Sequence, residues 1–164
     1  MKHLLWALWG LSLLAAPARA QEAAPEDFPS ADAAYVGQVN ALLDRAQERL
    51  EQSGFLLQHR QVSAVDSDSN WDSEAYLEAG GRYAVVAVCD VDCSDVDLQV
   101  TDSAGSEAAS DYSVSDTAFA RFEASETGSF GIQVRMYGCQ APACYAAVAL
   151  FRKSEAPPAP VTIE

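Results

Sequence analysis

Apolar residues between positions 32 and 53 recur every three or four places, which is the period of an α-helix with one buried face. Asp32 stands where a helix N-cap belongs, and Gly54 stands where a helix commonly stops. The spacing therefore predicts a helix over 32–53. Its stripe packs either on the protein's own sheet or on a second protein or copy. The stripe consists of Tyr35, Val36, Val39, Leu42, Leu43, Ala46 and Leu50.

From Phe55 onward the hydrophobic period changes to two, as expected for half-buried strands. Residues 96–100 and 130–136 alternate most clearly, and residues 83–89 are apolar on both faces, as in a central strand. Regularly spaced short strands predict an all-β, jelly-roll-like antiparallel β-sandwich of seven to eight strands, preceded by one α-helix. The predicted strands are 55–65, 74–79, 82–89, 96–101, 117–123, 129–137 and 143–151, with a candidate eighth at 105–110.

The two ends of the chain differ from the predicted domain at 54–153. Residues 1–20 combine a basic start, an apolar stretch too short to span a bilayer and the small-x-small pattern Ala18-Arg19-Ala20. This pattern predicts a cleaved signal peptide and a periplasmic or secreted bacterial protein. Residues 21–31 are expected to form a flexible lead, and the proline-rich residues 154–164 a disordered tail.

The charge is strongly acidic. The chain has 164 residues, with 10 basic and 24 acidic side chains and a net charge of −14. Loss of the leader removes Lys2 and Arg19 and no acid, which leaves 8 − 24 = −16. Such a field repels nucleic acid and anionic lipid, so we expect no nucleic-acid partner. It favours cations or basic partner surfaces, or serves solubility alone. No apolar run after the leader is long enough to cross a bilayer, so we expect no membrane span.

Four cysteines follow the leader, at Cys89, Cys93, Cys139 and Cys144. An even count in an exported chain predicts two disulfides. Zinc is the alternative, although the spacings C-x3-C and C-x4-C differ from the usual C-x2-C knuckles. We expect the local pairs Cys89–Cys93 and Cys139–Cys144, each flanking a turn. The chain entropy of loop closure does not exclude a crossed pairing.

An acidic loop lies between two of the predicted strands. It places Asp90, Asp92, Asp95 and Asp97 within eight positions. Calcium takes six to eight oxygen ligands and suits flexible loops that carry several carboxylates. The four aspartates are therefore a candidate calcium site. The alternative is an acidic turn that only water solvates.

Signals for catalysis are weak. His59 is the only histidine after the leader, and the chain has no G-x-S-x-G elbow, Walker loop, H-E-x-x-H or dinucleotide fingerprint. We therefore expect no catalytic residues, no cofactor besides the candidate calcium, and a non-catalytic binding or accessory protein with a protein or an extracellular polymer as partner. The alternatives are a small carboxylate-dependent hydrolase and a structural partner that assembles through the helix.

Several aromatic residues fall in the predicted β region. They could form a binding platform, but such residues more often lie in the core or in cross-strand pairs. The set consists of Trp71, Tyr76, Tyr112, Phe119 and Tyr137.

A series of short motifs runs from about Leu77 to Arg152. Gly80-Gly81-Arg82-Tyr83 opens a strand, Asp95-Val96-Asp97-Leu98 is a D-x-D-L strand, and Thr127-Gly128-Ser129-Phe130 opens another. Together they resemble the bacterial pre-peptidase C-terminal domain family. The resemblance implies a non-catalytic jelly-roll-like sandwich, here as a stand-alone secreted version. Some relatives bind calcium or extracellular polymers such as collagen, and the resemblance implies a calcium role for Asp95 and Asp97.

Overall fold

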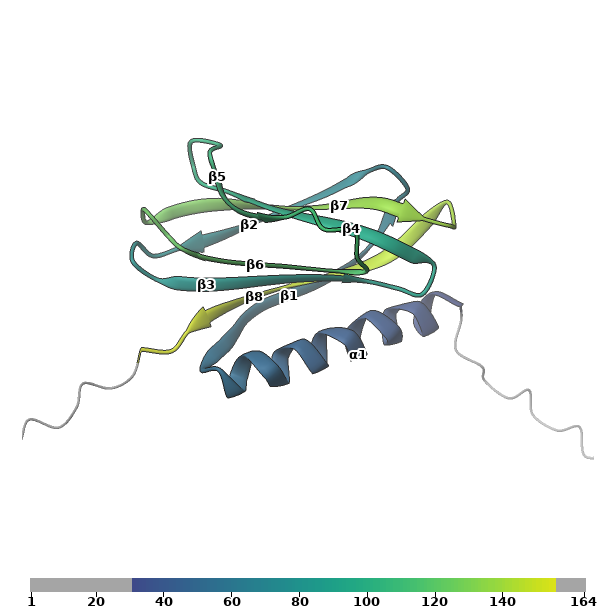
Figure 1. Cartoon of the computed structure of the whole chain (residues 1–164), viewed down its shortest axis with the longest axis horizontal. Helices are drawn as coiled ribbons and strands as arrows, with labels where there is room; N and C mark the ends of the chain where they lie inside the picture. Colours follow the sequence, from purple (N-terminus) through teal and green to yellow (C-terminus); the bar gives the residue numbers. More distant parts are fainter. Residues whose placement is uncertain (1–30, 156–164) are drawn as a thin grey trace, which may run out of the picture.

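The computed structural model describes residues 31–155, which form one helix and eight strands (Figure 1). The predicted signal peptide, nearly all of the lead and most of the proline-rich tail lie outside these residues. The elements are α1 (Ala31–Gln52), β1 (Phe55–Asp66), β2 (Asn70–Leu77), β3 (Arg82–Cys89), β4 (Cys93–Thr101), β5 (Glu107–Asp111), β6 (Thr117–Glu123), β7 (Gly128–Cys139) and β8 (Ala143–Lys153).

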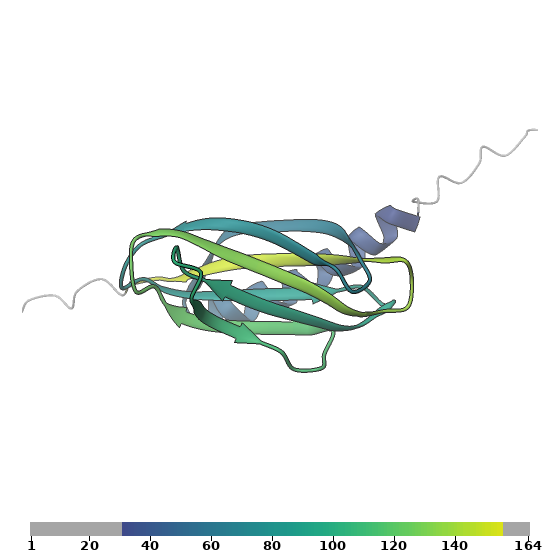
Figure 2. The same ribbon diagram turned by 90° about the horizontal axis from the view of Figure 1, so that it is seen from above.

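The strands form two four-stranded antiparallel sheets in the orders β1-β8-β3-β6 and β2-β7-β4-β5. The sheets pack face to face with α1 beneath the first (Figures 1 and 2). Every connection except β4–β5 carries the chain from one sheet to the other. One helix followed by an antiparallel β-sandwich is therefore confirmed.

The alternation in β4 shows how the sequence sets the faces of the strands. Val96, Leu98 and Val100 are fully buried between the sheets, while Asp97 and Gln99 lie on the opposite, outer face. A strand with one face in the core and one face open produces this period of two.

The largest departures from the predicted strands are at two starts, because β2 begins at Asn70 rather than at 74 and β4 begins at Cys93 rather than at 96. The candidate eighth strand is 107–111 rather than 105–110, and the other strand ends lie within about two residues of the prediction. Residues 70–73 are largely polar, so they carry no hydrophobic period. They become a strand because their backbone pairs with β7 from Asn70↔Arg135 onward. Pairing with β7, which is distant in the sequence, therefore determines where β2 and β4 begin.

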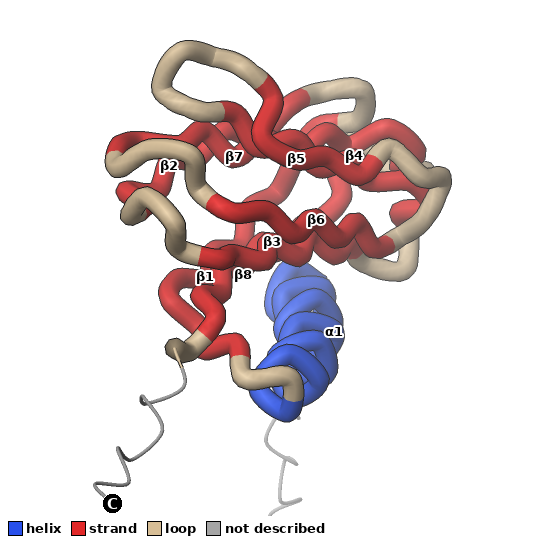
Figure 3. The backbone as a smooth tube through the Cα atoms, turned by 60° about the vertical axis from the view of Figure 1, so that its left-hand side comes forward, coloured by secondary structure: helices blue, strands red, loops and turns tan. Residues whose placement is uncertain are grey.

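The helix packs on the protein's own sheet, over β1, β8 and β3 (Figure 3). Val39 and Leu43 are almost fully buried, in one cluster with Val86 and Phe151. Gly54 follows the helix with φ of 75°, a left-handed conformation that glycine adopts without strain. The apolar stripe thus packs mainly within the domain.

Both predicted disulfides are present, and each joins the two sheets. Cys89 at the end of β3 bonds Cys93 at the start of β4, and Cys139 of β7 bonds Cys144 of β8. The described residues contain no free cysteine, so the zinc alternative is wrong for this structure. Cys93 and Cys139 are cross-strand partners, which places both bonds at the same end of the sandwich. Each short loop contributes about 2 kcal/mol in the chain-entropy model.

If the helix completes the core, truncating its buried stripe will destabilise the whole domain. Leu43→Ala should lower the free energy of unfolding by about 2–5 kcal/mol, because it removes buried methyl groups and leaves a cavity. Glu48→Ala, on the exposed face of the same helix, should change it by no more than about 0.5 kcal/mol. Urea denaturation of both variants measures the difference. Equal effects would contradict a core role for α1.

Candidate functional site

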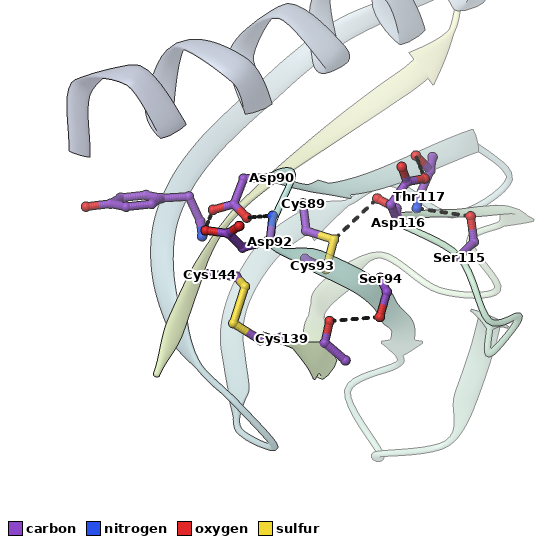
Figure 4. The surroundings of a disulfide bond; sticks show 12 residues. Cys89, Asp90, Asp92, Cys93, Ser94, Ser115, Asp116, Thr117, Cys139 and Cys144 are labelled. Carbon is purple, nitrogen blue, oxygen red and sulfur yellow. Dashed lines mark hydrogen bonds between the residues drawn. A yellow bond between two sulfur atoms is a disulfide. The ribbon is translucent and has the colours of Figure 1, made fainter. Parts of the chain in front are cut away.

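The first half of the acidic loop is fixed by its own hydrogen bonds. Asp90 is only 4% exposed, and its carboxylate accepts the backbone N–H of Asp92 at 3.0 Å and that of Tyr145 at 2.6 Å (Figure 4). Asp90 also donates its own backbone N–H to the carbonyl of Tyr145. Its side chain therefore holds the β3–β4 loop against β8. These hydrogen bonds also satisfy the carboxylate, as a buried polar group requires.

The second aspartate of the loop contacts the helix. The hydroxyl of Tyr35 in α1 donates to Asp92 Oδ2 at 2.8 Å, and this hydrogen bond raises the pKa of Tyr35. The ring of Tyr35 stacks on that of Tyr145 with centroids 6.1 Å apart. The backbone N–H of Val91 donates to Gln38 at 3.3 Å. The loop is thus closed over the N-terminal half of α1.

The other two aspartates belong to β4. Asp97 lies on the outer face of the sheet β2-β7-β4-β5, opposite Arg135 of β7, and Asp95 pairs with Gly138. Burial, and then the negative charge of Asp95, raise the pKa of Asp97, while Arg135 acts in the opposite direction. The four predicted calcium ligands are therefore divided between the helix side and the open sheet.

No three His, Cys, Asp or Glu side chains are grouped as metal ligands within residues 31–155. Calcium binding by the four aspartates stays a prediction. It would compete with the hydrogen bonds that Asp90 and Asp92 already accept. The resemblance-based role of Asp95 and Asp97 stays a prediction as well.

The outer face of the sheet β2-β7-β4-β5 is not covered by any element among the described residues (Figures 1 and 3). Register brings Gln99 of β4 directly opposite Gln133 of β7. Gln133 donates its amide to Asp72 of β2 at 2.8 Å, and Gln99 donates to Glu107 of β5 at 2.9 Å. Each of the two amides is therefore held by a carboxylate from an edge strand of the sheet, one from β2 and one from β5.

A hollow of about 190 Å³ lies on this face, lined by Asp97, Gln99, Tyr112, Gln133 and Arg135. We call these five residues the open-face site. The Tyr112 hydroxyl donates to Glu107 at 2.7 Å, which raises the pKa of Tyr112 and fixes the ring at the rim.

Arg135 is held over the ring of Tyr137, with its guanidinium carbon 4.6 Å from the ring centroid. Its Nε is buried and has no hydrogen-bond partner among the described residues, and the same holds for Oδ1 of Asp95. A buried donor and a buried acceptor without partners are costly unless a ligand or water supplies the bond. These two atoms are therefore unsatisfied although neither is exposed to solvent.

The sequence pattern shows the polar positions of β4 and β7 only as the face opposite the apolar one, so it does not reveal this site. The candidate aromatic platform is not one surface either. Trp71 packs against the core between the sheets, whereas Phe119 lies on β6, in the other sheet. Tyr112 lines the open-face site and Tyr137 stacks with Arg135. Tyr76 is exposed on the same outer face, on β2. The sequence signal for the site was a glutamine at an outward-facing position of each strand, Gln99 and Gln133. Only the pairing of β4 with β7 shows that the two are neighbours.

Comparison with known proteins adds no identity. No protein-family model and no curated protein matches this chain. The resemblance to the pre-peptidase C-terminal domain family therefore stays a prediction. Within residues 31–155 no helix is both long and apolar enough to cross a membrane.

The raised pKa of Asp97 has a consequence for stability. A carboxyl whose folded-state pKa lies above its unfolded value destabilises the fold when ionised, and the penalty disappears as pH falls below the unfolded pKa. Asp97→Asn should therefore raise Tm at pH 7, and the gain should shrink towards pH 3.5. Thermal unfolding at the two pH values measures it. A gain of equal size at both would contradict this account.

The calcium prediction has a direct test. Binding to the folded state alone raises stability, so millimolar calcium chloride should raise Tm of the unchanged protein. It should not raise Tm of the Asp95→Asn/Asp97→Asn variant. Sodium chloride at equal ionic strength is the control. An unchanged Tm in the parent protein would contradict a calcium site at these aspartates.

Proposed function

We propose that this protein is a non-catalytic binding domain of an oxidising, extracytoplasmic compartment, and that it binds a carbohydrate polymer at the open-face site. The observation that carries the proposal is the hollow itself. It combines two amides, a carboxylate, a guanidinium and a tyrosine on the one sheet face that α1 does not cover.

The chemistry of the site suits a hydroxyl-rich ligand. A sugar hydroxyl both donates and accepts, so its site needs both kinds of group. Gln99 and Gln133 donate to neighbouring carboxylates, which leaves their carbonyl oxygens as fixed acceptors. Arg135, whose guanidinium carries only donors, lines the hollow as well. Tyr112 adds a ring with one apolar face and one polar tip, as amphipathic ligands require.

The compartment follows from the cysteines. All four are disulfide-bonded, and such bonds persist in oxidising compartments. The predicted signal peptide and the family resemblance support the same assignment. Both bonds lie at the end of the sandwich where the β3–β4 loop meets α1, so they stabilise the scaffold and take no part in the hollow.

The face is also pre-organised. Cross-strand partners hold both glutamines, and a stacked tyrosine holds Arg135. Side chains that are already ordered lose less conformational entropy when a ligand binds. A sheet face of fixed polar groups favours binding along a polymer over burial of a small molecule, because the hollow of about 190 Å³ is smaller than typical ligand pockets of roughly 300–1,000 Å³.

Native affinity electrophoresis in gels that contain xylan, laminarin or galactomannan tests the proposal. At least one polysaccharide should retard the protein, and Gln133→Ala should weaken retardation about tenfold, the value of one or two hydrogen bonds. Gln47→Ala is the control, because it removes the same amide side chain from α1, away from the open-face site. Absence of retardation by all three, or equal loss in both variants, would contradict carbohydrate binding.

A further inference from the structure

Basic residues gather at the end of the sandwich where α1 and β8 end, although the chain as a whole is strongly acidic. Residues 31–155 contain eight Lys and Arg side chains. Three of them, Arg82, Arg121 and Lys153, line a hollow of about 370 Å³ together with Glu123. The hollow therefore has a local charge of 3 − 1 = +2 within a chain whose net charge is −14.

The register of the first sheet explains this cluster. Phe55 pairs with Lys153, Arg82 pairs with Glu123, and Ala84 pairs with Arg121. Ala84 and Phe55 belong to the cluster that packs under the helix. Because side chains at alternate positions share a face, these basic side chains lie on the helix-covered face, beyond the end of α1.

The cations are close together, and none of the three forms an ion pair within the residues that the structure describes. The guanidinium carbon of Arg121 lies 5.4 Å from the ring centroid of Phe55, and Lys153 Nζ lies 5.2 Å from the same centroid. Two like charges beside one ring repel each other. The ion pairs among the described residues are Arg60–Asp44 and Arg152–Glu78, so neither Arg82 nor Arg121 has a carboxylate within 4.0 Å. The cluster thus leaves two guanidinium groups available to an anion.

An apolar hollow of about 320 Å³ adjoins the basic one and shares Arg121 with it. Its lining includes Ala46 and Leu50 of α1, Val86 of β3 and Phe119 of β6, with Arg49 at its side. The Arg121 guanidinium carbon also lies 4.8 Å from the centroid of Phe119, so this side chain is held between two rings where the hollows meet. We call the two hollows together the α1–β6 groove.

We propose that the α1–β6 groove binds an acidic segment of a partner protein that carries an apolar residue beside its carboxylates. The apolar side chain packs between Leu50 and Phe119, and the carboxylates bind Arg82 and Arg121. Charge complementarity selects this occupant. Guanidinium groups match carboxylates in geometry, while the overall negative charge disfavours long polyanions. The groove lies on the opposite side of the sandwich from the open-face site, so this inference is independent of carbohydrate binding.

Fluorescence anisotropy with the full chain tests the groove. The probe is a fluorescein-labelled peptide of sequence Glu-Glu-Phe-Leu-Glu-Glu. It should bind saturably, and Arg121→Gln should weaken binding about tenfold or more, because charged hydrogen bonds are lost. Phe119→Ala should weaken it without changing charge. Arg45→Gln, an equal loss of charge on the helix outside both hollows, should leave it unchanged. Circular dichroism confirms that each variant is folded.

Each other outcome overturns the proposal. Equal binding by the parent, Arg121→Gln and Arg45→Gln would show non-specific attraction, and equal binding of a Lys-Lys-Phe-Leu-Lys-Lys probe would remove the role of charge. Tighter binding of a heparin oligosaccharide that Arg121→Gln abolishes would make the groove a polyanion site. A concentration-dependent dimer in sedimentation, lost in Arg121→Gln, would make a second copy the occupant. Absence of binding by the acidic probe would also overturn it.

Discussion

Strand β3 is buried on both faces, and the rest of the architecture depends on this. Seven of its eight residues are buried. Val85 and Ala87 face the second sheet, while Ala84, Val86 and Val88 face α1. A strand of this kind must lie between two apolar layers, because an exposed face would leave a row of valines in water. The helix supplies one layer and the sheet β2-β7-β4-β5 supplies the other.

This layering decides which faces of the sandwich stay uncovered. The helix covers β1, β8 and β3, so most of the outer face of the first sheet is closed. The outer face of the second sheet stays open and carries the fixed polar groups of the open-face site. The helix also does not fill the strip above β6, and the α1–β6 groove forms there. Both proposed surfaces are therefore consequences of one helix packed against one side of a sandwich.

The two ends of α1 meet opposite charges. Its N-terminal half contacts the acidic β3–β4 loop through Tyr35 and Gln38, and its C-terminal end lies near Arg121 and Lys153. This arrangement complements the helix dipole, which favours negative charge near the N-terminus and positive charge near the C-terminus. The disulfides pin the sheets at the acidic end. In this loop Asp92 contacts the helix through Tyr35, and Asp90 holds the loop against β8.

Local sequence determined the helix, most of the strands and the disulfide pairs. The hydrophobic period of 3.6 in the helix and of two in the strands depends only on which face of each element is buried. Cysteines four or five positions apart can meet across one turn. Tertiary structure decided what local pattern cannot encode. Gln99 and Gln133 are far apart in the sequence, but the pairing of β4 with β7 makes them neighbours. Asp92 and Asp97 are close in the sequence, but Asp92 contacts the helix and Asp97 lies on the open sheet. Arg82, Arg121 and Lys153 are likewise distant in sequence, and only the pairing of β3, β6 and β8 brings their charges to one hollow.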